Sequence, residues 1–147
     1  MKLKIIMTLI TVALVILVVV ISHLDANNET FDLGTIQFEE GIVNIYYFWG
    51  EGCPRCAEQD IFFERIKEEI GDYFNLHRFE VWYNENNVEV MTKVADIMNE
   101  RVTGVPFTII GEQTFTGFAS WMEEDIIYAI KEQSTNNFDV MQISIEN

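Results

Sequence analysis

Residues 43–56 read VNIYYFWGEGCPRC, and this stretch decides the fold. Its first half, Val43–Trp49, is a β-branched and aromatic run that is typical of a buried central strand. Turn-forming residues follow at 50–52 and end the strand. Because proline is favoured in the first turn of a helix, we predict a helix from Pro54 to about Ile70. The stretch therefore predicts a core strand that leads directly into a long helix.

The other predicted elements come from the same kinds of pattern. In the first helix, the residues expected to share one face are Ala57, Ile61, Phe62, Ile66 and Ile70. Strands are also predicted at Leu76–Trp82, Val105–Ile110 and Thr114–Thr116, with an edge strand at Thr35–Phe38. Helices are also predicted at Val88–Asn99, capped by residues 84–87, and at Ser120–Gln133, opened by a Ser-x-x-Glu capping box. Alternating strands and helices predict an α/β fold with a central mixed β-sheet flanked by helices.

The chain of 147 residues is long enough for one domain and a short appendage. Composition divides it into an N-terminal membrane anchor or signal segment (1–24), a polar tether (25–40), the folded domain (41–133) and a C-terminal tail (134–147). The tail has no regular pattern. A hydrophobic share of 49% is ample for a packed core and excludes an intrinsically disordered chain.

Residues 5–21 form an apolar run without a charge, a glycine or a proline. The run is apolar on every side and just long enough to cross a bilayer, so we predict one N-terminal transmembrane helix that anchors the protein in the cell membrane. A cleaved signal peptide, which would leave a secreted domain, is the alternative. Lys2 and Lys4 precede the run and Asp25 follows it, so the positive-inside rule predicts a cytoplasmic N-terminus and an extracytoplasmic domain.

The formal net charge is −15, and both Lys2 and Lys4 precede the first acidic residue. The part of the chain after the apolar run is therefore even more acidic than the whole. Such a domain is repelled by phosphate backbones, and this excludes nucleic-acid binding.

The chemistry of the sequence lies in its two cysteines, Cys53 and Cys56, with Pro54 and Arg55 between them. At the start of a helix, unpaired N–H groups and the helix dipole favour a thiolate on the first cysteine. The spacing lets the second sulfur turn back and close a small disulfide ring. Cys53 is thus the candidate nucleophile and Cys56 the candidate resolving thiol.

The cysteine pair has two other interpretations. A purely structural disulfide fits an exported protein, but a ring across two intervening residues constrains little chain. A metal site needs about four ligands, and the two histidines, His23 and His77, are scattered. We therefore predict reactive dithiol chemistry, without a metal and without a cofactor other than the disulfide itself.

These residues resemble the thioredoxin superfamily. The resemblance lies in Tyr47–Cys56, which opens the long helix, and in Gly104-Val105-Pro106-Phe107 before the closing hairpin. It covers nearly all of the chain beyond the N-terminal segment and implies a thioredoxin-like fold. It also implies that Pro106 is a cis-proline facing the disulfide, that Val105 offers its backbone to an extended substrate segment, and that Gly117 lies near the rim of the site.

The sequence departs from the family pattern at three positions. Tyr47 stands where thioredoxins typically hold a buried aspartate, Gly52 where a tryptophan usually precedes the first cysteine, and Ile61 where a proline kinks the helix. We expect Trp49, Pro54 and Arg55 to tune the active site. The Arg55 cation would stabilise the Cys53 thiolate and make the pair more oxidising, while Glu51 and Glu58 oppose it.

The sequence thus predicts an extracytoplasmic thiol–disulfide oxidoreductase that exchanges disulfides with protein thiols and has a membrane redox partner. Its direction, oxidase or reductase, stays open. One alternative is a redox-inert binding or accessory module of a membrane complex, against which the intact Cys-x-x-Cys argues. Another is a reductase that serves one client, for example in cytochrome c maturation.

Overall fold

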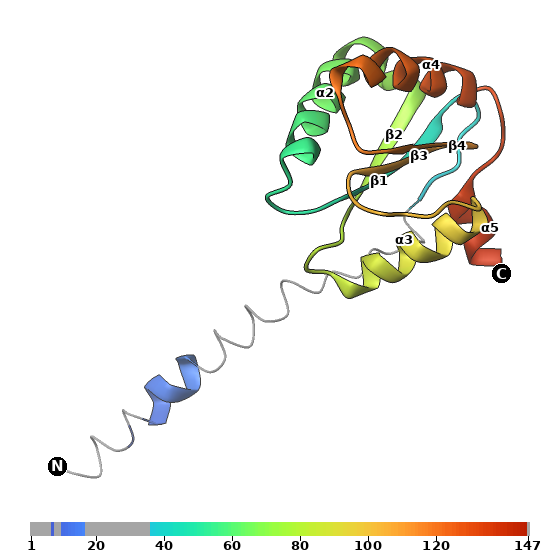
Figure 1. The fold of residues 1–147 in the computed structure, drawn as a ribbon. Coiled ribbons are helices and arrows are strands. Elements are labelled where there is room, and N and C mark those ends of the chain that lie inside the picture. Colours follow the sequence, from blue (N-terminus) through green and yellow to red (C-terminus); the bar gives the residue numbers. More distant parts are fainter. Residues whose placement is uncertain (1–6, 8–9, 17–35, 147) are drawn as a thin grey trace. The chain divides into compact units, whose positions relative to one another are not determined.

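The computed structural model describes residues 7, 10–16 and 36–146, which fall into two units (Figure 1). In the first unit, Met1–Thr30, residues 10–16 are helical. Within these described residues no helix is both long enough and apolar enough to cross a membrane. Most of the predicted transmembrane run at 5–21 lies outside the described residues.

The second unit, Phe31–Asn147, holds the sheet and its helices. The strands are β1 (Val43–Trp49), β2 (Phe74–Glu80), β3 (Phe107–Ile110) and β4 (Gln113–Thr116). The helices are α2 (Pro54–Ile70), α3 (Glu85–Ile97), α4 (Glu123–Gln133) and α5 (Val140–Glu146), with short 3-10 turns η2 (Gly71–Tyr73) and η3 (Ser120–Met122). The strand order is β2-β1-β3-β4; β1 runs parallel to β2 and antiparallel to β3, and β3 runs antiparallel to β4. The predicted α/β fold with a mixed sheet and flanking helices is confirmed.

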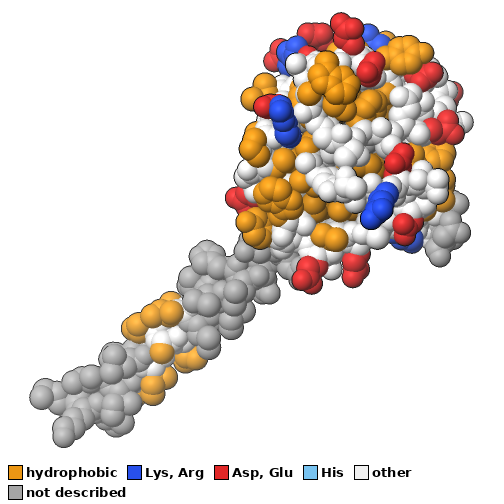
Figure 2. All heavy atoms as spheres, viewed as in Figure 1, with side chains coloured by type: hydrophobic (Ala, Val, Ile, Leu, Met, Phe, Trp, Pro, Cys, Tyr) orange, Lys and Arg blue, Asp and Glu red, His pale blue; other side chains and the backbone are white. Residues whose placement is uncertain are grey.

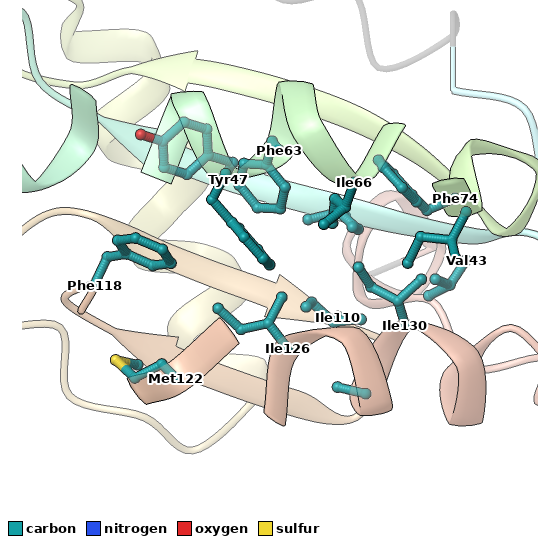
Figure 3. Close-up of a cluster of buried hydrophobic side chains, with 14 of the residues drawn as sticks. Val43, Tyr47, Phe63, Ile66, Phe74, Ile110, Phe118, Met122, Ile126 and Ile130 are labelled. Carbon is teal, nitrogen blue, oxygen red and sulfur yellow. The ribbon is translucent and has the colours of Figure 1, made fainter. Parts of the chain in front are cut away.

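Strand β1 lies at the centre of the fold, and its alternate side chains pack into two hydrophobic cores, one on each face of the sheet. Ile45 and Tyr47 face α2 and α4, where they pack with the apolar residues of those helices. Figure 3 shows the side chains of this first core pointing toward one another between the sheet and the two helices. Tyr46 and Phe48 enter the second core, with residues of α3 and α5. Period-two alternation thus explains why a strand buried on both faces reads as a continuous apolar run.

The predicted buried face of the first helix is wrong in part. Ala57 is exposed and Ile61 is 71% exposed. The buried positions of α2 are instead Cys56, Gln59, Phe62, Phe63, Ile66 and Ile70. The polar Gln59 is buried because its Nε2 donates a hydrogen bond of 3.0 Å to Thr108 Oγ1 on β3. A polar side chain whose amide nitrogen is hydrogen-bonded therefore takes the place that apolar periodicity assigned to a neighbour.

Two further boundaries differ from the prediction. Strand β2 spans Phe74–Glu80 and ends two residues earlier than expected. Helix α3 begins at Glu85, because the side chain of Asn84 accepts a hydrogen bond of 3.2 Å from the backbone N–H of Asn87. Asn84 is therefore an N-cap, as the predicted capping of this helix requires.

Three predicted details are wrong. Ser120 makes no side-chain capping bond, and a 3-10 turn precedes α4, so the capping box is not formed. Residues 36–38 of the predicted edge strand are not in a strand, and Thr35 lies outside the described residues. The strand before the hairpin begins at Phe107, so Val105 and Pro106 lie in the loop that leads into it.

The C-terminal tail, for which the sequence showed no pattern, contains helix α5. Val140 and Met141 are buried in the second core. Asp139 caps the helix by accepting a hydrogen bond of 2.8 Å from the Met141 N–H. The same carboxylate accepts hydrogen bonds from the Tyr46 hydroxyl at 2.7 Å and from Asn44 Nδ2 at 3.0 Å. A capped helix is thereby joined to the central strand.

Candidate active site

Cys53 and Cys56 form a disulfide at the start of α2. Cys53 is the N-cap residue, with extended backbone, and Cys56 lies in the first turn; their Cα atoms are 5.2 Å apart. Cys53 Sγ accepts a hydrogen bond of 3.2 Å from the Cys56 N–H, one of the unpaired donors of a helix N-terminus. Cys53 is 7% exposed and Cys56 is 1% exposed. The outer sulfur thus lies where the helix dipole stabilises a negative charge.

The loop before β3 lies against this disulfide. The Val105–Pro106 peptide is cis, as the family resemblance implied, and the Val105 carbonyl oxygen lies 3.9 Å from Cys53 Sγ. The Gly117 N–H donates a hydrogen bond of 2.7 Å to the Pro106 carbonyl. Gly117 has a φ of 76°, a left-handed conformation that favours glycine. The closing hairpin therefore helps to hold the Val105 backbone at the disulfide.

An open hollow of about 190 Å³ borders the cysteines. Its lining residues are Trp49, Gly50, Gly52, Cys53, Pro54, Cys56, Ala57 and Asp60. Of these, only the cysteines and Asp60 carry ionisable side chains. Asp60 follows Cys56 by four residues, so both lie on one side of the helix. The hollow therefore combines the disulfide with one carboxylate.

A cluster of charged and aromatic side chains forms one wall of the site. Arg78 on β2 pairs with Asp60 at 2.8 Å between Nη2 and Oδ1. The carbon of its guanidinium lies 5.4 Å from the centre of the Trp49 ring and 5.6 Å from that of the Tyr47 ring. Such distances are typical of cation–π contacts. Trp49 and Asp60 are thus both held by one arginine from the neighbouring strand.

Tyr47 lies beneath Cys56, in the position where the family typically has an aspartate. Its hydroxyl donates a hydrogen bond of 3.0 Å to the Cys56 carbonyl. Burial raises the pKa of Tyr47, the Asp60 carboxylate raises it further, and Arg78 opposes that rise. Tyr47 therefore stays protonated at neutral pH and serves as a donor, not as a base.

Arg55 forms an ion pair with Glu58 in solvent. Its Nη1 lies 2.7 Å from Glu58 Oε2, and the two side chains are 60% and 52% exposed. An ion pair that is this exposed is screened by water. The structure places Pro54 and Arg55 on the exposed side of the first helical turn, while Trp49 lies in the wall with Arg78.

Glu80 is a site residue that sequence reasoning missed. At the end of β2, its Oε1 accepts hydrogen bonds from the N–H groups of Glu51 at 3.2 Å and Trp82 at 2.9 Å. Its Oε2 accepts another from the Tyr83 N–H at 2.9 Å. One carboxylate thus joins the loop before Cys53 to the loop after β2. No sequence signal marks this role, because it arises only when β1 and β2 pair.

Asp60 and Arg78 were missed as well, although a signal existed for Asp60 in its spacing of four residues from Cys56. No group of three or more His, Cys, Asp or Glu side chains in the described part of the chain is arranged to hold a metal ion. Another hollow, of about 730 Å³, is lined by residues such as Lys67, Gly71 and His77, and neither cysteine borders it.

Comparisons with known proteins agree with this architecture. No protein-family model matches the chain, and no curated protein does. An uncharacterized thioredoxin-like protein from Clostridium perfringens is similar over 68% of this chain and 77% of its own, with 20% identity and a TM-score of 0.50. A protein from Chlorobium tepidum, provisionally named thiol:disulfide interchange protein DsbE, covers 65% of this chain and 82% of its own, with 10% identity and a TM-score of 0.49. A Malassezia sympodialis thioredoxin covers 66% and 79%, with 18% identity and a TM-score of 0.45. This chain therefore has the thioredoxin-like fold, with a Cys-Pro-x-Cys pair at the start of its first long helix.

Proposed function

We propose that the protein is a thiol–disulfide oxidoreductase that exchanges disulfides with protein thiols through Cys53 and Cys56. The observation that carries this proposal is the position of their disulfide, at a helix N-terminus and 3.9 Å from the Val105 carbonyl. A structural staple needs no such position. For a reactive disulfide this position is useful, because the helix dipole stabilises the Cys53 thiolate and the Val105 backbone beside it is placed to bind a client segment.

The exchange proceeds through a mixed disulfide. When the protein is oxidised, a client thiolate attacks Cys53 Sγ, the Cys53–Cys56 bond breaks, and Cys56 leaves as a thiolate that takes up a proton. A second client thiolate then displaces Cys53, so the client gains a disulfide and the protein gains two electrons. When the protein is reduced, the same steps run in reverse and a client disulfide is broken. The direction of exchange depends on whether the redox partner of the protein oxidises or reduces Cys53 and Cys56.

Asp60 is the proposed proton acceptor for Cys56. In the reducing direction Cys56 must lose its proton to attack the mixed disulfide on Cys53, and it is 1% exposed, so bulk water reaches it poorly. Asp60 carries the one carboxylate among the residues lining the shared hollow, and Arg78 holds it at 2.8 Å. A positioned carboxylate of this kind acts as a general base.

We also propose that the domain works outside the cytoplasm, anchored by residues 5–21 and served by a membrane redox partner. The support is the apolar run with Lys2 and Lys4 before it and acidic residues after it. A membrane-impermeant protease added to spheroplasts should digest the domain. Full protection of the domain would contradict this location.

The redox function is tested by trapping. Cys56→Ser leaves the nucleophile without its resolving partner, so client mixed disulfides should accumulate on Cys53 and should disappear on reduction. Cys53→Ser is the matched control and should trap far fewer clients, because Cys56 is buried beneath it. Equal trapping by the two variants, or none by either, would contradict the proposed division of roles.

A further inference from the structure

Two large aromatic side chains are exposed in the loop that follows β2, and this loop packs against the edge of the disulfide hollow. Trp82 is 52% exposed and Tyr83 is 75% exposed, and Val81 separates them from the end of β2. The Trp82 ring lies against Gly50, so closely that a Cβ added at Gly50 would collide with it. Gly50 itself lines the hollow together with Cys53. We call Trp82 and Tyr83 the aromatic ledge; it borders the site without taking part in the exchange chemistry.

The aromatic ledge is held in place before any client arrives. The Glu80 carboxylate accepts hydrogen bonds from the N–H groups of both ledge residues and from that of Glu51, in the loop that leads to Cys53. The neighbouring Val81 N–H donates a hydrogen bond of 2.9 Å to the Trp49 carbonyl. A surface that is already ordered loses little conformational entropy on binding. Exposed rings with fixed backbones are therefore suited to recognition.

The charges around the aromatic ledge are negative. Glu51 and Glu85 are exposed, and within the described residues neither carboxylate forms an ion pair. Arg55, between the cysteines in the sequence, and Arg78, in the wall of the site, are each paired with a carboxylate of α2. Figure 2 shows acidic side chains distributed around the visible face of the folded unit, with apolar side chains between them. Glu51 and Glu85 thus contribute negative charge next to the loop residues that Glu80 holds.

Exposed aromatic faces beside unpaired carboxylates favour cations. The ring quadrupole attracts a guanidinium or an ammonium group, and nearby carboxylates add to that attraction. An anionic side chain in the same place would be repelled by Glu51 and Glu85. The two rings and the two carboxylates together therefore favour a positively charged side chain over a negatively charged one at the aromatic ledge.

We propose that the aromatic ledge docks a Lys or Arg side chain that lies next to the reacting cysteine of a client polypeptide. The inference rests on the proposed function and names the substrate class of that site: extended segments whose cysteine is flanked by basic residues. The client sulfur meets Cys53 Sγ, and the basic side chain lies over Trp82 and Tyr83. Segments with acidic residues beside the cysteine are poor clients.

The test uses the reduced full-length protein and two short peptides. Each peptide carries one cysteine as a mixed disulfide with 2-mercaptoethanol, flanked by arginines in one peptide and by glutamates in the other. The Cys53 thiolate attacks the peptide sulfur of the mixed disulfide and 2-mercaptoethanol leaves as a thiol; Cys56 then attacks Cys53 and releases the peptide thiol. The protein forms its disulfide, and its two electrons reduce the mixed disulfide to two thiols. Loss of protein thiols is followed after acid quenching. Each rate is divided by the rate with 2-hydroxyethyl disulfide, so that a general change in Cys53 reactivity cancels.

The arginine peptide is expected to react about fivefold faster than the glutamate peptide, which corresponds to about 1 kcal/mol. Trp82→Ala and Tyr83→Ala should each lower that ratio, and high salt should reduce the part that Glu51 and Glu85 contribute. Tyr73→Ala is the matched control, because Tyr73 is 46% exposed and precedes the opposite end of β2. It should keep the wild-type ratio.

The outcomes separate the two proposals. A wild-type ratio near one, or a ratio that survives both ledge substitutions, overturns the aromatic ledge while leaving the redox function standing. An equal loss of the ratio in Tyr73→Ala overturns the ledge as well, because the effect would then not be local. A wild-type protein that does not react even with 2-hydroxyethyl disulfide overturns the proposed function, and the ledge with it.

Discussion

The Tyr47 hydroxyl donates a hydrogen bond of 3.0 Å to the Cys56 carbonyl. This bond joins the buried cysteine of the first helical turn to the central strand. In Tyr47→Phe the ring is kept and the donor is lost, so we expect a loss of about 1 kcal/mol in the free energy of unfolding of the oxidised protein. Urea unfolding measures it. Tyr128→Phe, which removes the hydroxyl of a 65% exposed ring, should change stability by much less.

Asp60→Asn should slow the resolving step in the reducing direction. The amide cannot accept the Cys56 proton, so the mixed disulfide on Cys53 should persist longer. General bases typically contribute about 100-fold or more, but water partly substitutes in an open hollow, and we expect a slowing of about tenfold. Rapid quenching and mass spectrometry would measure the lifetime of the mixed disulfide. Asp72→Asn, in the turn η2 that follows the far end of α2, should leave that lifetime unchanged.

Arg55→Ala should shift the reduction potential by little. Its cation is paired with Glu58 in solvent, and an exposed charge interaction is worth up to about 1 kcal/mol. The expected change is therefore about 20 mV or less, toward more reducing values, because the thiolate loses a stabilising charge. Glu58→Gln frees the Arg55 cation and should shift the potential the opposite way. Equilibration against a glutathione buffer measures both, and shifts of the same sign would contradict the electrostatic account.

His77 should make stability dependent on pH. Burial lowers the pKa of His77 below its ordinary value of 6.5, while the Asp139 carboxylate partly opposes that shift. Below pH 6.5 the unfolded chain therefore binds more protons than the folded one, and stability is lost as the pH falls through the folded pKa. His77→Gln removes this contribution. Urea unfolding at several pH values should show that the free energy of unfolding falls less steeply toward acid pH in the variant than in the wild type. The same pH dependence in both proteins would contradict a contribution from His77.

Asp139→Ala should destabilise the domain by about 2–4 kcal/mol. The substitution removes the cap of α5, leaves the Tyr46 hydroxyl without its acceptor, and takes away one of the two hydrogen bonds that Asn44 Nδ2 donates, the other going to the Gln37 carbonyl. Thermal unfolding measures the loss. Asp125→Ala, at an exposed position on α4, should change stability far less. Because Asp139 is remote from the cysteines in the fold, the reactivity of Cys53 should be retained in protein that remains folded.

The sequence was most informative where local pattern and chemistry coincide. The bounds of β1, the start of α2 and the hairpin after Pro106 all follow from periodicity, turn residues and the two prolines. The cysteine pair was found in the same way, because Cys53 and Cys56 stand at a predicted strand–helix junction. These features depend on residues that are neighbours in the chain, so a single sequence carries them.

Features that depend on long-range contacts could not be predicted. Gln59 is buried because Thr108 accepts its hydrogen bond, and that partner lies on another strand. Helix α5 is short, and its cap Asp139 bonds Asn44, which is 95 residues away along the chain. Glu80 likewise looks like an ordinary acidic residue at the end of a strand until pairing with β1 brings Glu51 to it.

The contact between Gly50 and Trp82 links two positions on different loops. Since the ring occupies the space of a Cβ at position 50, a side chain gained there requires a smaller residue at 82 or a ring turned outward. Natural relatives are therefore expected to vary these positions as a pair, with a small residue at 50 where 82 is aromatic and the reverse combination elsewhere. In the evolution of such chains, side-chain volume beside the disulfide would then increase at position 50 only where it decreases at position 82, and the reverse.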